Sequence, residues 1–430
     1  MNKAQKLLEQ VNSINLGVSS KTILIYDGGM FPSIAERLSR DFGKTIYYVP
    51  YYSSDPRIAR SHIGEGLRGV TVVTNFWNHL DKDSLIFFPD CYNEDLVEYL
   101  KREGYEVLGS GKSAILEINK EKSREVCEKA GIKMSPAIKI KGLDDLKNHL
   151  RDKTNKVIKP VVFRGESETF KYEDEESSKS IFDKISISLG PYASEYEFLV
   201  EDRVEGIECG VDGVTFDGKL LNPLMFGVTS GYCYLSKVVN QEEIPKPFKT
   251  TMSKLADVFG EYKTRMFFGT EKIYDKKTSY LIDLTMRMSN IHVSGIWTEL
   301  IKNFSDFVYS LGVGNPVDPS VEHKYTGSAV LVTSNNVTEW ANIKAPEDAQ
   351  NWLKLEYNSK INGNYYVAPH NQNTIGAIIA VGDSWDEVIE TIQEKFEQLE
   401  CTPSALDPIP SREEFLEVIN KVKEYEIDFE

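Results

Sequence analysis

The chain has few cysteines and histidines, and no pattern joins them. Its five cysteines lie apart without a Cys-x-x-Cys pair, and an odd number argues against a closed disulfide framework. Its six histidines show neither His-x-x-x-His nor another zinc spacing. We therefore expect neither a disulfide scaffold nor a transition-metal site, and the free thiols suit a reducing cytoplasm.

An excess of positive charge and long apolar runs are also missing. The 66 acidic and 50 basic residues give a net charge of -16, which leaves no electrostatic footprint for nucleic acid or an anionic membrane. No run approaches the roughly 18 apolar residues of a membrane-spanning helix, and the first residues lack the apolar core of a signal peptide. We expect a cytoplasmic protein that acts on small molecules, without nucleic-acid or membrane partners.

Strand and helix patterns alternate between residues 20 and 110, as in a parallel α/β unit. The 430-residue length, with 41% hydrophobic residues, allows about three globular domains. The turn DGGM after the first strand has two glycines, which fit an anion site or a plain strand-to-helix turn equally well. Asp90, after a later strand, could bind an amine or cap a helix. The predicted strands are 21–26, 44–49, 85–89 and 105–108, and the helices are 33–42 and 93–102.

An acid, a hydroxyl and a base stand at alternate positions near the end of one predicted strand. The segment SYLIDLTMRMSN begins apolar at Ser279 and then presents Asp283, Thr285 and Arg287. Side chains two apart on a strand share a face, so we expect the three groups to converge. Because Asp is a poor strand residue, we interpret this pattern as a site for a divalent cation that carries an anion.

The preceding strand, 267–274, adds a second acid to this pattern. If the hairpin loop has the five residues 275–279, Glu271 lies opposite Asp283, whereas a four-residue loop puts the acids on opposite faces. Like charges directly opposite are destabilising unless a hard cation such as Mg²⁺ neutralises them, since its ligands are oxygens. The alternative is an exposed hairpin with solvated acids.

Candidate nucleotide ligands lie between residues 110 and 210. The strand 156–160 places Lys159 near its end, just before a loop that contains Arg164, and an ammonium there can meet a polyphosphate. Glu208 follows the strand 196–201 and could hold two ribose hydroxyls, because a carboxylate accepts two hydrogen bonds. Taken alone, a Lys before a Pro usually faces solvent, and Glu208 could be a solvated loop carboxylate.

The order of these segments resembles the ATP-grasp superfamily and, within it, the phosphoribosylamine-glycine ligase branch. The ordered set is a long helix over 112–130 with Lys120, then GIKMSP, VIKP, FLVEDRVEGIE, a strand with Glu271, and DLTMR. The resemblance covers most of the chain and implies a mixed α/β architecture. It implies a parallel α/β domain at 1–111, a nucleotide clamp whose two α+β halves are 112–195 and 196–320, and a small α+β domain at 321–430.

The resemblance also implies ligands and a reaction. In the family, ATP converts a carboxylate to an acyl phosphate, which an amine attacks to give an amide, so a monomer or homodimer would take a carboxylate and an amine as substrates. The cofactors implied are ATP and Mg²⁺ or Mn²⁺. The resemblance assigns the phosphates to Lys120 and Lys159, and Arg164 in the loop after Lys159 is a further candidate. It assigns the adenine to Glu201, Asp202 and Val204 and the ribose to Glu208. The metal falls to Glu271 and Asp283, with Thr285 as a weaker ligand, and the transferred phosphate to Arg287 with Lys159.

Three features depart from the family pattern. Thr285 stands where the family usually has an Asn metal ligand, and the flap after Lys159 has one glycine and many acids. The N-terminal turn also lacks the family's glycine signature. Two alternatives therefore accompany the ligase hypothesis: a catalytically altered ATP-binding module, and an ATP-dependent small-molecule kinase on the same fold.

Overall fold

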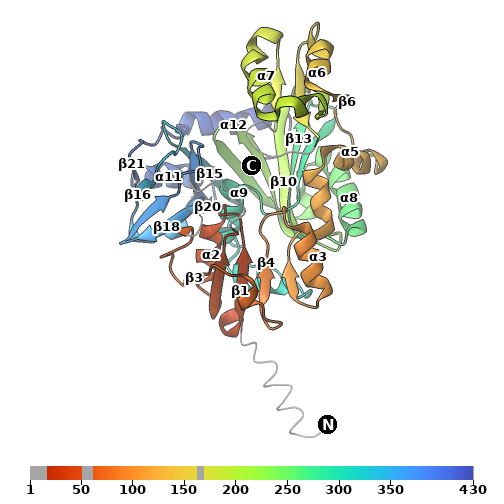
Figure 1. Ribbon diagram of the computed structural model, residues 1–430. Helices are drawn as coiled ribbons and strands as arrows, with labels where there is room; N and C mark the ends of the chain where they lie inside the picture. The colour runs from red at the N-terminus through yellow and green to blue at the C-terminus, as the bar shows by residue number, and fades with distance from the viewer. Residues whose placement is uncertain (1–16, 51–61, 162–168, 430) are drawn as a thin grey trace. The chain divides into compact units, whose positions relative to one another are not determined.

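The computed structural model describes residues 17–50, 62–161 and 169–429 (Figure 1). Its contacts divide the chain into two compact units. In the described part, no helix has both the length and the apolarity needed to cross a membrane. Unit 1 comprises Met1–Asp90, Leu96–Gly109 and Asn290–Ile409, and unit 2 comprises Cys91–Asp95, Ser110–Ser289 and Pro410–Glu430.

Unit 1 contains a parallel sheet of five strands in the order β3-β2-β1-β4-β5, which confirms the predicted parallel α/β unit. The central strand β1 is fully buried at Ile23, Leu24 and Ile25, as expected where both faces of a parallel sheet are covered. The strands are β1 (Thr22–Tyr26), β2 (Lys44–Tyr48), β3 (Val70–Val72), β4 (Leu85–Phe87) and β5 (Glu106–Leu108), with helices η1 (Val18–Ser20), α2 (Pro32–Leu38), η3 (Trp77–His79) and α3 (Glu94–Arg102).

Two antiparallel arrays complete unit 1. Strand β20 (Thr374–Gly382) lies between β15 (Tyr325–Val332) and β17 (Leu353–Leu355), and helices α9 (Ile291–Leu300) and α11 (Trp385–Phe396) pack on this array. The second array has the order β18-β19-β16-β21. Its strands are β18 (Asn358–Ile361), β19 (Asn364–Val367), β16 (Ala341–Lys344) and β21 (Glu400–Thr402); α10 (Phe304–Gly312) and η7 (Glu347–Asn351) are further helices of the unit.

The larger sheet of unit 2 is antiparallel, with neighbouring strands in the order β14-β13-β10-β11-β12. Helix α8 (Lys246–Glu261) packs on it through the buried stripe Phe248, Met252, Leu255 and Phe259, whose spacing keeps one helix face apolar. The strands are β10 (Ile207–Phe216), β11 (Lys219–Ser230), β12 (Cys233–Val239), β13 (Arg265–Tyr274) and β14 (Ser279–Thr285); η6 (Gln241–Glu243) and α12 (Arg412–Glu424) also belong to this unit.

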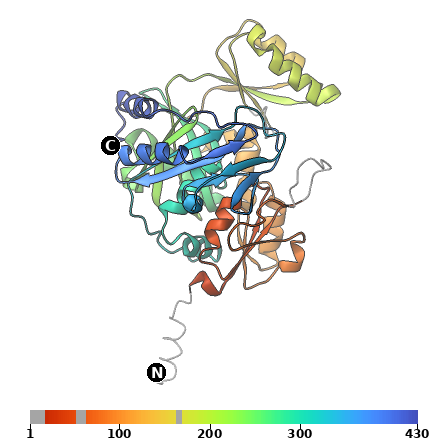
Figure 2. The ribbon, with the colours of Figure 1, turned by 90° about the vertical axis from the view of Figure 1, so that its left-hand side faces the viewer.

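The smaller sheet of unit 2 has the order β6-β9-β7-β8, and helices α6 (Leu143–Leu150) and α7 (Glu175–Leu189) cover one face (Figure 2). Ile158 and Val200 belong to the core beneath these helices. Because side chains alternate along a strand, Lys159 and Glu201 point to the other face. The strands are β6 (Ala137–Lys141), β7 (Lys156–Pro160), β8 (Phe170–Tyr172) and β9 (Glu197–Asp202), and η5 (Gly190–Ser194) follows α7.

The prediction of one long helix over 112–130 is wrong, because the helix is interrupted at Asn119. The backbone of Asn119 is extended, and its side chain accepts a hydrogen bond of 2.9 Å from the N–H of Lys122. Asn119 therefore caps a new helix, which begins at Lys120. The segment consists of η4 (Gly111–Ala114), α4 (Ile115–Ile118) and α5 (Lys120–Lys129).

Lys272, on β13, is fully buried, and its burial affects the free energy of unfolding. Its Nζ lies 2.9 Å from the Met252 sulfur and 5.6 Å from the centre of the Phe248 ring, and burial lowers its pKa from 10.5 to about 7. Between those two values the unfolded chain binds more protons than the native state, so this residue makes stability rise with pH. We predict that Lys272→Met raises the free energy of unfolding by about 1–3 kcal/mol near pH 7.5.

Urea unfolding at pH 7.5 and 9.5 measures this effect. The gain in stability should be smaller at pH 9.5, where less work is needed to keep the buried amine neutral. Lys219→Met, at an exposed position on β11, is the matched control and should change neither value appreciably. A destabilised Lys272→Met protein, or an equal gain at both pH values, would contradict the account.

Candidate functional site

The hairpin of β13 and β14 brings Glu271 directly opposite Asp283. Its loop has four residues, 275–278, so the five-residue loop considered from the sequence is wrong. A four-residue loop alone would leave the two acids on opposite faces. The ladder shifts by one residue at Ile282, and this bulge restores the pairing. Two carboxylates therefore stand side by side on one face of the sheet.

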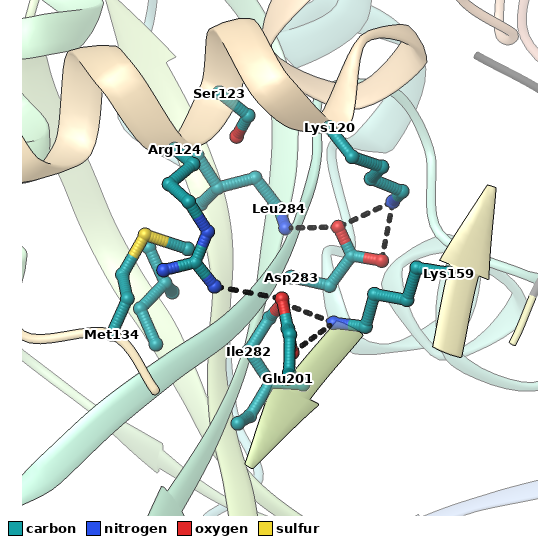
Figure 3. A pocket seen from close by; sticks show the side chains of 10 residues that line it. Lys120, Ser123, Arg124, Met134, Lys159, Glu201, Ile282, Asp283 and Leu284 are labelled. Atoms are coloured by element: carbon teal, nitrogen blue, oxygen red, sulfur yellow. Dashed lines mark hydrogen bonds and ion pairs between the residues drawn. The ribbon is translucent and has the colours of Figure 1, made fainter. Parts of the chain in front are cut away.

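Lys120 neutralises Asp283 in this structure (Figure 3). Its Nζ lies 2.5 Å from each carboxylate oxygen, and the two side chains are 15% and 26% exposed. Burial is the largest single influence and would lower the pKa of Lys120, but the charge and hydrogen bond of Asp283, together with the charges of Glu117 and Glu271, outweigh it, so the pKa is raised. Since Lys120 is the first residue of α5, the cap at Asn119 positions this ammonium.

A second set of charges surrounds Glu201, on β9. Lys159, only 3% exposed, donates a hydrogen bond of 2.9 Å to the carbonyl oxygen of the bulge residue Ile282 and lies 3.3 Å from Glu201 Oε2. The other carboxylate oxygen accepts a 2.7 Å hydrogen bond from Arg124 (Figure 3). One buried carboxylate is thus shared by two cations.

Arg124 was not predicted from the sequence. It follows Lys120 by four residues, so the two side chains lie on the same face of α5. That spacing is the signal that could have revealed it. Arg124 also donates a 2.7 Å hydrogen bond to the carbonyl oxygen of Ser135, which fixes its guanidinium beside Glu201.

These groups line a small pocket that is partly open to solvent (Figure 3). Helix α5 and strands β7, β9 and β14 contribute to its walls. Three cations and two anions line it, so it carries an excess of positive charge. The lining residues are Lys120, Ser123, Arg124, Met134, Lys159, Glu201, Leu281, Ile282, Asp283 and Leu284.

Neighbouring acids help to raise the pKa of Glu271. Its pKa is raised to about 7, first because protein atoms surround the carboxylate and then because Asp283 and Glu208 are negative, while Lys120 and Lys159 oppose the shift. The side chain is nevertheless exposed by surface area, so water screens part of the repulsion. The direction of the shift shows that a further cation beside Glu271 would be favourable.

Arg287 does not line the pocket. Strand β14 ends at Thr285, and beyond it Arg287 is only 2% exposed, so the expected convergence of alternate side chains on one spot fails after the strand ends. The Arg287 Nε donates a 3.0 Å hydrogen bond to Glu117 Oε1, and the N–H of Met286 donates to the other oxygen at 2.7 Å. The assignment of Arg287 to the transferred phosphate stays a prediction.

Thr285 lies next to a buried acid that was not predicted from the sequence. It pairs with Gly269, where an added Cβ would lie 2.7 Å from Asp212 Oδ1 and 3.5 Å from the Thr285 Cβ. Asp212 accepts hydrogen bonds from Tyr234 at 2.8 Å and Ser289 at 3.0 Å, and burial raises its pKa to about 6. Only a glycine leaves room for this arrangement.

The segment assigned to adenine and ribose joins β9 to β10. Asp202 is exposed and pairs with Lys156, and Glu208 is exposed at the beginning of β10. Val204 is half-buried, and its backbone makes no hydrogen bond in the part of the chain that the structure describes, so its N–H and carbonyl are available to a base edge. Arg164 lies outside the described residues.

The site offers Mg²⁺ two carboxylate ligands. Among the residues that the structure describes, no three side chains of His, Cys, Asp or Glu converge as metal ligands. The opposed pair Glu271 and Asp283 supplies two carboxylates on one face. Mg²⁺ commonly binds through one or two carboxylates and takes phosphates and water for the rest of its shell, so two acids suffice where a nucleotide also binds.

Comparison with known proteins identifies the fold. No protein-family model and no curated protein sequence matches the chain. Solved structures do match, and they show that the chain has the ATP-grasp fold that the sequence resemblance implied.

Three of these solved structures illustrate the similarity. The phosphoribosylamine-glycine ligase of Thermotoga maritima is 16% identical with a TM-score of 0.68, over 90% of this chain and 99% of that chain. The biotin carboxylase domain of Hydrogenobacter thermophilus 2-oxoglutarate carboxylase, in complex with MgADP, ADP and bicarbonate, is 14% identical with a TM-score of 0.64, over 90% and 91%. The L-amino acid ligase of Bacillus licheniformis is 15% identical with a TM-score of 0.56, over 89% and 98%.

The shared carboxylate of Glu201 leads to a stability prediction. Glu201→Gln removes the buried anion that Lys159 and Arg124 share and leaves Arg124 only the exposed Glu128, at 3.0 Å. Removal of one member of a buried ion pair costs about 3–5 kcal/mol. Urea unfolding should show a loss of that order. Asp202→Asn, at the exposed neighbouring position, should change stability little, because exposed ion pairs contribute little. Equal effects in the two variants would show that Glu201 is not the buried counter-charge.

Proposed function

We propose that this chain is an ATP-dependent ligase that joins a small carboxylate to a small amine through an acyl phosphate. The observation that carries the proposal is the carboxylate pair Glu271 and Asp283, set on adjacent strands beside the ammonium groups of Lys120 and Lys159. Two acids for a metal and two lysines for phosphates would supply the positioning and charge neutralisation on which ATP-dependent phosphoryl transfer depends.

Lys120 and Lys159 bind the phosphates of ATP in this proposal. A polyphosphate that enters the pocket offers Lys120 a more highly charged partner than Asp283, and it offers Arg124 and Lys159 an anion besides Glu201. Lys120 then changes partner, which leaves the Asp283 carboxylate available to a metal.

Glu271 and Asp283 would hold Mg²⁺, or Mn²⁺ in its place, with Thr285 as a weaker third ligand. The metal, when bound, neutralises charge on the phosphates of ATP. Glu201, Asp202 and Val204 would contact the adenine through backbone groups, and Glu208 would accept hydrogen bonds from the ribose. These residues fix the nucleotide so that its terminal phosphate lies near the lysines.

The reaction needs two group transfers. An oxygen of the substrate carboxylate attacks the terminal phosphorus of ATP, the bond to ADP breaks, and an acyl phosphate forms. The amine nitrogen then attacks the acyl carbon, phosphate leaves with the electron pair of the broken C–O bond, and the nitrogen releases a proton to give the amide. Lys159 and Arg287 would stabilise the phosphate during both steps. Glu117 accepts a hydrogen bond from Arg287, and the negative charge of Glu117 also helps to raise the pKa of Lys120.

The solved structures support this proposal at the level of reaction type. The Hydrogenobacter thermophilus domain holds MgADP and bicarbonate, and the Thermotoga maritima and Bacillus licheniformis proteins are both ligases. Thr285 favours a second candidate, a module or kinase on the same fold with altered metal binding, because its hydroxyl is a weaker ligand than the Asn amide of the family. A phosphorylated product without an amide would identify the kinase.

The metal assignment predicts the effect of removing each carboxylate. Asp283→Asn and Glu271→Gln should each lower Mg²⁺-dependent ADP formation, measured with a panel of carboxylates and amines, by at least about 100-fold, because charge stabilisation at the phosphates is lost. Asp257→Asn, an exposed acid on α8, is the control and should retain full turnover. Undiminished turnover in either site variant would remove that residue from the metal site.

The assignment of Thr285 as a weak metal ligand predicts how its substitution changes the Mg²⁺ dependence of turnover. The amide of Asn reaches further and offers a stronger carbonyl acceptor, so Thr285→Asn should lower the Mg²⁺ concentration needed for half-maximal turnover. Thr285→Val keeps the shape without the oxygen and should raise that concentration or stop turnover. If Val behaves like Thr across a magnesium titration, Thr285 is not a ligand.

A further inference from the structure

The two lysines of the pocket in unit 2 contact consecutive residues of β14 (Figure 3). Lys159 donates a 2.9 Å hydrogen bond to the carbonyl oxygen of Ile282. Lys120 contacts the next residue, Asp283, and its Nζ lies 2.5 Å from each carboxylate oxygen. The strand that carries one of the two acids is therefore held by the cations that the proposed function assigns to phosphates.

The backbone of Lys120 is fixed where its side chain can reach β14. Lys120 is the first residue of α5, directly after the capping residue Asn119. Its N–H donates a 3.0 Å hydrogen bond to the carbonyl oxygen of Val161, which directly follows β7. The lysine stem is flexible, so a change of partner at the ammonium needs rotation of this side chain and no movement of α5.

Lys120 and a divalent cation compete for the same carboxylate. The hydrogen bonds from Lys120 engage both oxygens of Asp283, and Oδ1 also accepts a 2.8 Å hydrogen bond from the N–H of Leu284. An ammonium and a metal ion on one carboxylate repel each other. Of the two opposed acids, Glu271 alone is then left for Mg²⁺, an ion that gives up its water reluctantly.

A polyphosphate competes with Asp283 for the same ammonium. It carries more negative charge than one carboxylate and offers several strong acceptor oxygens. Phosphates that take the Lys120 ammonium release the oxygens of Asp283 and so favour a metal ion there. Coupling of this kind is reciprocal, because the factor by which nucleotide raises the affinity for metal is the factor by which metal raises the affinity for nucleotide.

We propose that Lys120 makes metal binding at Glu271 and Asp283 depend on nucleotide, because its ammonium occupies Asp283 until a phosphate takes it. The inference rests on the proposed function, since it concerns the metal and the phosphates of that site, and it adds how the two are coupled. If the ion pair is closed for about nine-tenths of the time, the apparent affinity for metal falls about tenfold, because only the open fraction binds it.

Titration with Mn²⁺ alone tests this competition, with free Mn²⁺ measured by its electron paramagnetic resonance signal. Without nucleotide, Lys120→Met should bind Mn²⁺ at least about tenfold more tightly than the unchanged chain, because Asp283 is then unoccupied. Addition of Asp283→Asn to Lys120→Met should remove the gain, which places the ion on this carboxylate. Lys122→Met, at an exposed lysine of the same helix, is the charge control and should bind Mn²⁺ like the unchanged chain.

Thermal unfolding provides a second readout of the same competition. Lys120→Met leaves two facing carboxylates without their nearest cation, so its unfolding midpoint should fall. Mn²⁺ should raise that midpoint by more than it raises the midpoint of the unchanged chain, because a ligand that binds the native state more tightly stabilises it more. The neutral variant Lys120→Gln should change both measurements in the same directions, and it replaces Lys120→Met should that variant not fold.

The outcomes separate the coupling from the ligase function. Equal Mn²⁺ affinity in the unchanged chain and in both neutral variants at position 120 would overturn the coupling. Amide formation by the unchanged chain in that case would keep the ligase function. Tighter Mn²⁺ binding in Lys120→Met, without ATP-dependent amide formation by the unchanged chain, would refute the ligase and keep the coupling.

Discussion

The repulsion between Glu271 and Asp283 is the constraint on which the site in unit 2 depends. Two carboxylates side by side on a sheet are unfavourable unless positive charge lies close to them. Lys120 reaches Asp283 from the beginning of α5, and Lys159 lies near Glu271 from the end of β7. These cations come from segments more than a hundred residues earlier in the sequence. The fold therefore brings charges from distant segments together where the two acids must be balanced.

Apolar packing elsewhere offsets that cost. The buried stripe of α8 and the core beneath α6 and α7 hold the two sheets of unit 2, and neither includes a site residue. In the smaller sheet, Lys159 and Glu201 lie on the face away from those helices. The division explains how buried charges that contribute little net stability can be tolerated. It also leaves Lys120 able to exchange Asp283 for another anion without disturbing a core.

Much of this arrangement could be predicted from the sequence, because it depends on local patterns. The alternating segments of unit 1 predicted its parallel sheet. The pairing of Glu271 with Asp283 was predicted only for a five-residue loop, and the structure reaches it by another route, a four-residue loop and a bulge. The bulge at Ile282 and the helix break at Asn119 could not be predicted, since a one-residue shift or a cap leaves the hydrophobic period almost unchanged.

The central claim is that the carboxylate pair holds a metal beside nucleotide phosphates. A crystal structure with Mn²⁺ and a non-hydrolysable ATP analogue tests it most directly, because anomalous scattering locates Mn²⁺ without assumptions about its ligands. The account predicts an anomalous peak between Glu271 and Asp283, with the Lys120 ammonium on a phosphate. A nucleotide bound with Lys120 still paired to Asp283, and no peak between the two acids, would contradict it.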